Sequence, residues 1–505
     1  MGETADRLTA IEGAGGSDRS RWLALYVLCA GMLMIVLDQT IVNVALPSIQ
    51  DDLGFSQSSL AWVVNAYLIA FGGLLLLSGR LGDLIGRKSV FMAGLALFVA
   101  ASVLCGLAQT QEMLVGARFL QGIGGALSSA VILGMIVTMF PEPRDQMKAI
   151  GVYAFVASAG ASIGLLLGGV LTEAINWHWI FFVNVPIGIG TAFLASRLVD
   201  RDEGLGLERG ADVFGALLLT GSLMIGVYTL VVNAADYGWA SLETLGFGAV
   251  SLALGLAFVA RQARIERPLI PLSVFRSRTT SGANIVQALM VAGMFGMFFL
   301  GSLYFERVLG YGPLEIGLAF LPVALAIGTL SIGFAERLNM RFGAKATLIP
   351  GLTLMAAGLA LFSRAPLDAT YLVDLFPSMV LLGVGAGLSF PSLMTLSMAD
   401  ATPETSGLAS GLVNTTLQVG GAIGLAVLAT LSTDRTESLL ADGEAAASAL
   451  TDGYRLAFLV GIGLLGAAIV VASTLLPNVV PEEQPELAEA EQGEFEPEPA
   501  YSEAA

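Results

Sequence analysis

The stretch LDQTIVNVALP, from Leu37 to Pro47, places an aspartate inside an apolar run that begins at Trp22. An ionised carboxylate at the centre of a membrane helix costs roughly 2.5–3.5 kcal/mol on translocon insertion scales. Ionisable residues that persist at such positions usually serve transport or proton transfer. Asp38 is therefore the first candidate functional residue.

The 505-residue chain as a whole is apolar, with 55% hydrophobic and 13% charged residues. Apolar runs of about 18–25 residues recur along it, each long enough to cross a hydrocarbon core of roughly 30 Å. This composition excludes an ordinary soluble enzyme and predicts an all-α integral membrane protein. We expect fourteen spans, at about 22–47, 60–78, 89–108, 113–138, 149–171, 179–196, 213–233, 244–260, 282–305, 316–334, 346–362, 372–395, 408–431 and 454–476.

The basic residues predict the orientation of these spans. Placing the N-terminus inside puts most of the 24 Lys and Arg in cytoplasmic loops and flanks. The exceptions are Arg307, Arg364, Arg435 and Arg455 on the outer side and Arg118 within a span. The positive-inside rule then predicts a multi-pass protein of the cell membrane with both termini in the cytoplasm.

Internal repetition predicts two bundles. Four sets of residues recur at offsets of 256 to 261: Leu53-Gly54-Phe55 and Leu309-Gly310-Tyr311; Gly86 and Gly343; Gly122-x-Gly124 and Gly383-x-Gly385; Gly151, Gly160, Gly164 and Gly411, Gly420, Gly424. Because each pair crosses the membrane in the same direction, the halves are parallel repeats, an arrangement that places a substrate path between two six-helix bundles. The expected divisions are an N-terminal segment (1–21), a first bundle (22–200), two extra helices with linkers (201–279), a second bundle (280–478) and a tail (479–505). The tail is rich in Glu and Pro and has no Lys or Arg, a composition typical of disorder.

Four motifs give the chain a family resemblance. LDQTIVNVALP, GRLGDLIGRK (Gly79 to Lys88), RFLQGIGGA (Arg118 to Ala126) and the glycine series of the fifth span are similar to motifs of the major facilitator superfamily. Together they resemble the fourteen-span drug:proton antiporters of that superfamily, often called the EmrB/QacA type. One position departs from the pattern, because the family commonly has Pro where this chain has Leu165.

The stretch GRLGDLIGRK predicts a tight cytoplasmic turn between the second and third spans. Its expected gating residues are Gly79, Arg80, Asp83, Gly86, Arg87 and Lys88. Glycines allow the backbone to turn sharply, and Asp83 near the start of the next helix would be favoured by the helix dipole. A short basic loop is the simpler interpretation; the resemblance implies a latch that holds the cytoplasmic side closed. In the second half Met340 stands where Asp83 would be, so the latch is expected to be asymmetric, with its acidic residue in the first half alone.

The fifth span carries glycines every four residues. Gly160, Gly164 and Gly168 form a bare stripe that lets a neighbouring helix approach closely, and Gly169 follows the last of them. Such a stripe alone indicates packing; the resemblance implies that it lies at the interface between the bundles. Leu165 removes the kink that proline would introduce there.

Arg118 is the second charge expected inside a span. Its counterpart in the second half is Met379, and Asp38 corresponds to the apolar stretch around Met294. Fold symmetry therefore does not require the two charges. By helix rise, Arg118 lies roughly 9 Å and Asp38 roughly 15–20 Å from the outer ends of their spans, so the guanidinium can approach the carboxylate. The pair is either a static ion pair or a proton-coupling site, since burial raises the proton affinity of a carboxyl group and a nearby cation lowers it.

The lining of the substrate path is less specific. Candidates are the polar residues within spans, the broad apolar side chains of the ninth span and one acid near its outer end: Gln121, Gln287, Asn414, Gln418, Met294, Phe298 and Glu306. Flexible or aromatic side chains suit varied ligands, although such residues more often face lipid or the core. The family commonly has Gln at the position of Glu306.

The sequence predicts a proton-coupled antiporter that exports small hydrophobic or cationic compounds by alternating access. Its expected partners are a small-molecule substrate, protons and the lipid bilayer, with no nucleic acid, no metal and no cofactor; an envelope-spanning partner is left open. Two alternatives remain: export of one endogenous metabolite or lipid-like molecule, and a receptor or scaffold that no longer transports. An enzyme is not expected, because no Ser/His/Asp or Cys/His set can be assembled and the single histidine, His178, is expected at a membrane interface. The chain has no phosphate-binding G-x-x-x-x-G-K-[ST] loop, so ATP is not the expected energy source.

Overall fold

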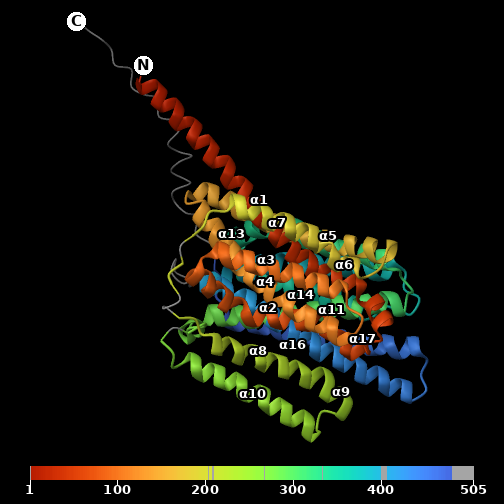
Figure 1. Ribbon diagram of the computed structural model, residues 1–505. Coiled ribbons are helices and arrows are strands. Elements are labelled where there is room, and N and C mark those ends of the chain that lie inside the picture. The colour runs from red at the N-terminus through yellow and green to blue at the C-terminus, as the bar shows by residue number, and fades with distance from the viewer. Residues whose placement is uncertain are drawn as a thin grey trace.

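The computed structural model describes residues 2–202, 204–206, 210–266, 268–331, 334–399 and 406–479, and these ranges contain helices and loops without a strand. The long helices lie side by side (Figure 1). The expected acidic tail lies outside the described residues, apart from its first residue.

The described part of the first half contains six long helical segments, of which the sixth is divided at Val183. Its helices are α1 (Gly2–Leu53), α2 (Gln57–Ile85), α3 (Arg87–Gly106), α4 (Gln111–Met139), α5 (Pro143–Ala174), α6 (Trp179–Phe182) and α7 (Asn184–Leu198). Hydroxyl side chains cap two of these helices, α2 and α4. The Ser56 hydroxyl accepts from the backbone N–H of Ser59 at 3.0 Å, and that of Thr110 accepts from Met113 at 3.2 Å.

The second half follows a pair of extra helical segments. The extra helices are α8 (Val213–Tyr228), the π-helix η2 (Thr229–Asn233), α9 (Ala234–Tyr237) and α10 (Leu242–Gln262). After the 3₁₀ turn η3 (Leu272–Arg276) come α11 (Arg278–Arg307), α12 (Pro313–Ser331), α13 (Phe334–Phe342), α14 (Ala344–Phe362), the π-helix η4 (Tyr371–Leu375), α15 (Phe376–Met398), α16 (Ser406–Ala441) and α17 (Ala446–Leu475). Within the described residues, thirteen helices are long and apolar enough to cross a membrane, and α5 adds the shorter apolar helix Ala159–Ala174. The predicted all-α membrane architecture is confirmed.

Helix packing confirms the internal repeat. A Cβ atom on Gly124 of α4 would lie 2.6 Å from the backbone nitrogen of Phe98 on α3. A Cβ atom on Gly385 of α15 would lie 2.7 Å from the backbone nitrogen of Met355 on α14. Phe98 and Met355 are 257 positions apart, close to the offset of the two glycines. The α3–α4 crossing therefore recurs as the α14–α15 crossing, with the same glycine at the contact.

The extra helices attach to the bundle through α8, and α10 lies outside α8 (Figure 1). The Ser222 and Ser251 hydroxyls each donate to the other residue's backbone carbonyl, both at 2.8 Å. Asp212, at the start of α8, accepts from the Arg261 Nε and Gln262 Nε2 groups of α10 at 2.7 Å each. These contacts make α8 and α10 one unit.

The stretch GRLGDLIGRK is mostly helical, and the prediction of a loop beginning at Gly79 was wrong. Helix α2 continues to Ile85, because Gly79 and Gly82 adopt helical conformations and Gly82 packs closely against Val131 of α4. Gly86 alone makes the turn, with a φ of +93°. In the second half α13 occupies the corresponding place, and Gly343 turns with a φ of +91°.

Candidate functional site

Asp38 is fully buried and accepts three hydrogen bonds from two other helices. Its Oδ2 atom accepts from a terminal nitrogen of Arg118 on α4 at 2.6 Å. Its Oδ1 atom accepts from Gln121 Nε2, also on α4, at 2.7 Å and from Asn184 Nδ2 on α7 at 2.8 Å. The two charges that the sequence singled out therefore form a closed ion pair inside the first half of the chain.

Arg118 is held by more than its carboxylate partner. Its Nε atom donates to the backbone carbonyl of Val63 at 2.9 Å, and a terminal nitrogen donates to Gln121 Oε1 at 2.6 Å. The guanidinium carbon lies 4.4 Å from the centre of the Tyr67 ring, within the range of a cation–π interaction. The guanidinium consequently keeps favourable contacts when Asp38 is neutral.

Gln121 belongs to this network, although the sequence suggested a place in the substrate path. Its Nε2 atom donates to Asp38 and to the Ser102 hydroxyl of α3, the latter at 2.8 Å. Its Oε1 atom accepts from Arg118 and faces the Cys105 thiol at 3.6 Å. Both ends of the Gln121 amide are thus occupied, and its orientation is fixed.

Sequence reasoning missed Ser102 and Asn184. Asn184 is the first residue of α7, and its backbone position beside the break at Val183 places the amide against α1. Its Oδ1 atom is buried and has no hydrogen-bond partner among the described residues. The available signal was a single amide in the apolar stretch FFVNVPIG, from Phe181 to Gly188.

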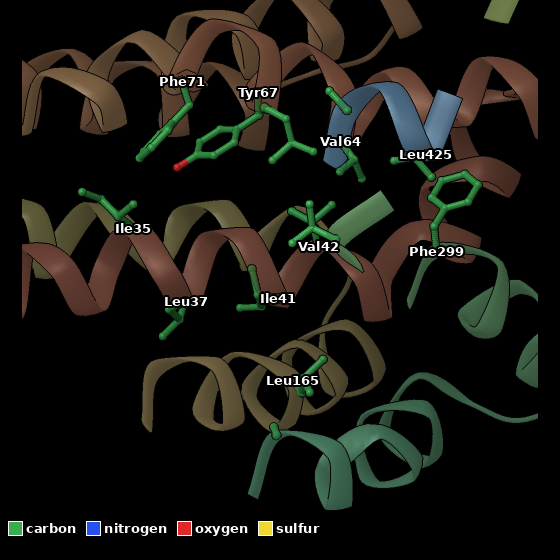
Figure 2. Close-up of a cluster of buried hydrophobic side chains, with 14 of the residues drawn as sticks. Ile35, Leu37, Ile41, Val42, Val64, Tyr67, Phe71, Leu165, Phe299 and Leu425 are labelled. Carbon is green, nitrogen blue, oxygen red and sulfur yellow. The ribbon is translucent and has the colours of Figure 1, made fainter. Parts of the chain in front are cut away.

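An apolar casing surrounds the polar network. Figure 2 shows Tyr67 and Phe71 of α2 on one side of α1, and Leu37 and Ile41 directed toward the other side, where Leu165 of α5 lies. Tyr67, Leu37, Ile41 and Leu165 are each at most 2% exposed. A carboxyl group in such surroundings can hold or release a proton as its partners move.

The glycine stripe of α5 packs against α1 beside Asp38. A Cβ atom on Gly164 would lie 2.0 Å from the Thr40 hydroxyl and 2.9 Å from the Leu37 carbonyl. Gly160 and Gly168 face Leu33 and Ile41 in the same way. The stripe itself is therefore internal to the first half, contrary to its expected place between the bundles, because its face points toward α1.

A neighbouring face of α5 meets the second half. A Cβ atom on Gly169 would lie 2.7 Å from Leu314 Cα at the start of α12, and one on Gly317 would lie 2.5 Å from the Leu165 carbonyl. Helix α5 thus lies between the Asp38 helix and the other half. With leucine at 165, α5 runs unbroken from Pro143 to Ala174.

Replacing Gly164 by alanine is expected to force α1 and α5 apart. Overpacking of this kind costs about 1–3 kcal/mol, so thermal stability and export should both fall. Gly151→Ala on the same helix is the matched control, because a Cβ atom there meets nothing within 4 Å. Equal behaviour of the two variants in thermal unfolding would show that the α1–α5 contact tolerates separation.

The turn at Gly86 is organised by a residue that the sequence did not point to. Asp202, after α7, accepts from the backbone N–H groups of Arg87 and Lys88 at 2.7 and 3.1 Å. It therefore occupies the positive end of the α3 dipole, the place predicted for Asp83. Asp83 lies instead in the last turn of α2 and forms an ion pair with Arg87 at 3.3 Å.

The basic side chains of the turn bind backbone carbonyls. Arg87 donates to the Gly134 carbonyl of α4 at 2.9 Å, and Lys88 Nζ donates to the carbonyls of Ser196 and Val199 at 3.0 and 2.5 Å. Arg80 is partly exposed. These contacts join α2, α3, α4 and the end of α7, all within the first half.

The second half repeats the lysine contact but not the acidic ones. Lys345 Nζ donates to the carbonyls of Ser473 and Leu476 at 2.7 and 2.8 Å. Asn478 takes the place of Asp202, with its Oδ1 atom accepting from the backbone N–H of Ala346 at 3.3 Å. The asymmetry inferred from Met340 thus extends to the capping residue.

The substrate-path candidates fall into two groups. Gln287 is buried and donates to the Val413 carbonyl at 2.9 Å, while the exposed Asn414 donates to Ser410 of its own helix. Phe298 and Met294 are partly buried, and the Phe298 ring packs against Phe320. Gln418 Oε1 and Glu306 Oε2 are buried oxygens with no hydrogen-bond partner in the described part of the chain, so these two retain capacity for a ligand.

A cavity of about 460 Å³ lies away from the Asp38 network. Its lining comes from the helix ends and includes Asp52, Gly106, Gln109, His178 and Trp179. His178 stacks on Trp177 with ring centres 3.8 Å apart. None of the network residues lines this cavity.

The described residues contain no cluster of three or more His, Cys, Asp or Glu side chains able to hold a metal ion.

Comparisons with known proteins agree with one another. A family model described as Major Facilitator Superfamily matches residues 28–425. The puromycin resistance protein pur8 of Streptomyces alboniger is 38% identical over 92% of this chain and 93% of its own length. The cephamycin export protein CmcT of Amycolatopsis lactamdurans is 36% identical over 93% and 96%. The tetracenomycin C resistance and export protein of Streptomyces glaucescens is 32% identical over 92% and 85%.

Solved structures share the fold at low sequence identity. A bacterial homologue of the human lysosomal transporter Spinster, inward-facing and unoccupied, superposes with a TM-score of 0.64 at 17% identity, covering 90% of this chain and 98% of that one. The human organic anion transporter MFSD10 gives a TM-score of 0.58 at 15% identity, covering 88% and 99%.

Proposed function

This chain belongs to the Major Facilitator Superfamily, and we propose that it is a proton-coupled antiporter that exports small hydrophobic or cationic compounds, antibiotics among them, across the cell membrane. The observation that carries the coupling is the fully buried Asp38–Arg118 ion pair at 2.6 Å. A carboxylate in this position is costly in a membrane, and the second half of the same fold has Met379 in place of Arg118.

The names of the relatives support the substrate class. Puromycin, cephamycin and tetracenomycin C appear in the names of proteins that each match more than nine-tenths of this chain. We infer a small organic antibiotic or a related toxic compound as the substrate here. Because each name specifies one compound, a dedicated exporter of a single metabolite is the second candidate, and a panel of unlike compounds distinguishes it from a broad exporter.

Exchange of a proton for substrate follows from the network. Arg118 binds Oδ2 of Asp38 and thereby favours the ionised carboxylate, so movement of the guanidinium away favours uptake of a proton by Asp38. Arg118 has Val63, Gln121 and Tyr67 as remaining contacts, so this movement does not leave an isolated cation. Substrate entry that displaces or restores Arg118 would thereby couple substrate binding to the protonation of Asp38.

Alternating access also requires the halves to separate. At the end predicted to face outside, Arg307 pairs with Asp51, and the backbone N–H of Leu314 donates to Glu173 Oε2 at 3.1 Å. Gln57 Nε2 donates to the Ser432 hydroxyl at 3.3 Å at the same end. We propose that these contacts close the outer side and break during export. The turn at Gly86 would serve as the latch on the cytoplasmic side.

Cysteine labelling is expected to place both termini in the cytoplasm. Starting from a variant without the buried Cys29 and Cys105, Glu444→Cys in the loop between α16 and α17 should react with an impermeant maleimide on intact cells. Leu205→Cys, after α7, should react only after permeabilisation. Both positions are exposed. The reverse pattern at either one would contradict the proposed orientation.

Reconstituted export tests the function. Proteoliposomes containing the chain should accumulate fluorescent cationic dyes or antibiotics against a concentration gradient when a pH gradient is imposed. An ionophore that collapses the gradient is the control. Accumulation that is unchanged by the ionophore would contradict proton coupling, and absence of transport for the entire panel would favour the dedicated exporter or the non-transporting receptor.

A further inference from the structure

We propose that Asn184 is a positioning residue that serves both protonation states of Asp38, donating to the carboxylate when it is ionised and accepting from its O–H when it is protonated. The inference rests on the proposed proton-coupled function of Asp38. It adds a defined side-chain movement: rotation of the Asn184 amide about its Cβ–Cγ bond, which exchanges Nδ2 for Oδ1.

The partners of Asp38 in this structure are all donors. Arg118 reaches Oδ2, and Gln121 and Asn184 both reach Oδ1. This arrangement suits an ionised carboxylate, which only accepts hydrogen bonds. A protonated carboxyl group carries an O–H that needs an acceptor, and leaving a buried donor without a partner is costly. One neighbour must therefore change its role when the proton arrives.

Arg118 and Gln121 do not meet this need. A guanidinium has no acceptor. The oxygen of Gln121 already accepts from Arg118, and turning that amide would break its bonds to Arg118, Asp38 and Ser102 together. Tyr67 on α2 and Cys105 on α3 are the other titratable side chains that face Asp38. The hydrogen bonds of these two side chains go to residues other than Asp38: the Tyr67 hydroxyl accepts from Gln39 at 3.5 Å, and the Cys105 thiol faces Gln121.

Asn184 has the free acceptor. Its Oδ1 atom is buried without a hydrogen-bond partner among the described residues, while its Nδ2 atom lies 2.8 Å from Asp38. Rotation of the amide would bring Oδ1 to the place of Nδ2 without movement of the backbone. The rotation exchanges an unpartnered oxygen for an unpartnered nitrogen, so Asn184 makes one hydrogen bond to Asp38 in either protonation state. Asn184 therefore spares the protonated Asp38 from carrying a buried O–H group without an acceptor.

A double-mutant comparison of purified full-length protein tests this role. Asp38→Asn stands for the protonated acid, because an asparagine amide donates as the acid O–H does. Asn184→Leu removes the donor and the acceptor at similar size. We expect Asn184→Leu to lower the midpoint of thermal unfolding by about 2–4 °C in both the Asp38 and the Asp38→Asn backgrounds.

The matched control is Asn65→Leu on α2. Asn65 is also fully buried, but neither atom of its amide has a hydrogen-bond partner in the described residues. Its replacement should not lower the midpoint in either background. Destabilisation by Asn184→Leu only in the Asp38 background would show that Asn184 is a donor alone and would overturn the inference. Absence of any effect would overturn it as well.

A second variant covers failure of Asn184→Leu to fold. Asn184→Ser keeps a group that both donates and accepts, so substrate-triggered proton release should keep its wild-type pH midpoint. A displacement of more than about tenfold in proton concentration, 1.4 kcal/mol, would contradict the inference. Absence of proton release from the wild-type protein would contradict the proposed function instead, while the unfolding comparison would still decide the hydrogen-bonding role of Asn184.

Discussion

Replacing Asp38 by asparagine is expected to reduce gradient-driven export to background while the protein remains folded in the membrane. The neutral amide neither takes up nor releases a proton, so the exchange step has no carrier. Arg118 keeps its bonds to Val63 and Gln121 and its contact with Tyr67, and the new amide oxygen can accept from it. Uphill dye export in proteoliposomes should therefore be lost, and passive exchange of substrate retained.

Asp52→Asn is the control for this substitution. Asp52 lies near the end of the same helix, with a side chain 55% exposed, so its neutralisation should leave export at the wild-type level. Wild-type gradient-driven export by Asp38→Asn would contradict the coupling role of Asp38. Glu306, whose Oε2 atom is buried without a hydrogen-bond partner in the described residues, would then be the next acid to replace.

Replacing Arg118 by glutamine is expected to produce the largest loss of stability. The change leaves the buried carboxylate without its cation, and breaking a buried pair costs about 3–5 kcal/mol in soluble proteins. The loss should grow with pH, because Asp38 can escape the penalty by binding a proton in acid but is ionised in alkaline buffer. Thermal unfolding at both ends of the accessible pH range measures this dependence.

The double variant Asp38→Asn/Arg118→Gln separates stability from coupling. Neither charge remains buried, so the pH-dependent part of the loss should disappear. Uphill export should stay absent, because no titratable group remains at Asp38. A loss of stability in Arg118→Gln that is the same in acid and alkali would contradict the view that the unpaired carboxylate causes it.

The architecture could be predicted because membranes impose a simple pattern. Apolar runs of spanning length locate the helices, and recurring small residues locate the contacts between them. Gly124 and Gly385 show why the repeat was readable: each lets two helix backbones approach at the same place in its half. The same glycines do not show how far a helix continues, so the extension of α2 to Ile85 was not predicted.

The two charges of the site could be predicted because an isolated Asp or Arg stands out in an apolar span. Asn184 and Ser102 could not, because neutral polar residues are common in spans and their partners lie on other helices. Asn184 is separated from Asp38 by 146 positions.

The internal repeat also relates the end of α7 to the end of α17, at an offset of 277. Lys88 donates to the carbonyls of Ser196 and Val199. In the same way, Lys345 donates to the carbonyls of Ser473 and Leu476. Asn184 then corresponds to Gly461, another sign that fold symmetry does not require it.

Asp202 illustrates the same limit at the turn between α2 and α3. Local reasoning assigned the positive end of α3 to Asp83, the nearest acid in the sequence. The structure supplies Asp202 from 115 positions beyond Arg87, because the segment after α7 returns to the turn. Backbone bonds from Leu205 to Asp83 and from Gly206 to Leu84, at 2.9 and 3.0 Å, fix that segment. Tertiary proximity of this kind has no signature in the spacing of residues.

Proton release on substrate addition tests the central claim most directly. Purified protein in weakly buffered solution should release protons when a transported dye or antibiotic is added, and the release should vanish in Asp38→Asn at substrate concentrations that still saturate binding. Asp52→Asn should release protons as the wild type does. Undiminished release from Asp38→Asn, with substrate bound, would show that another group carries the proton and would contradict the account.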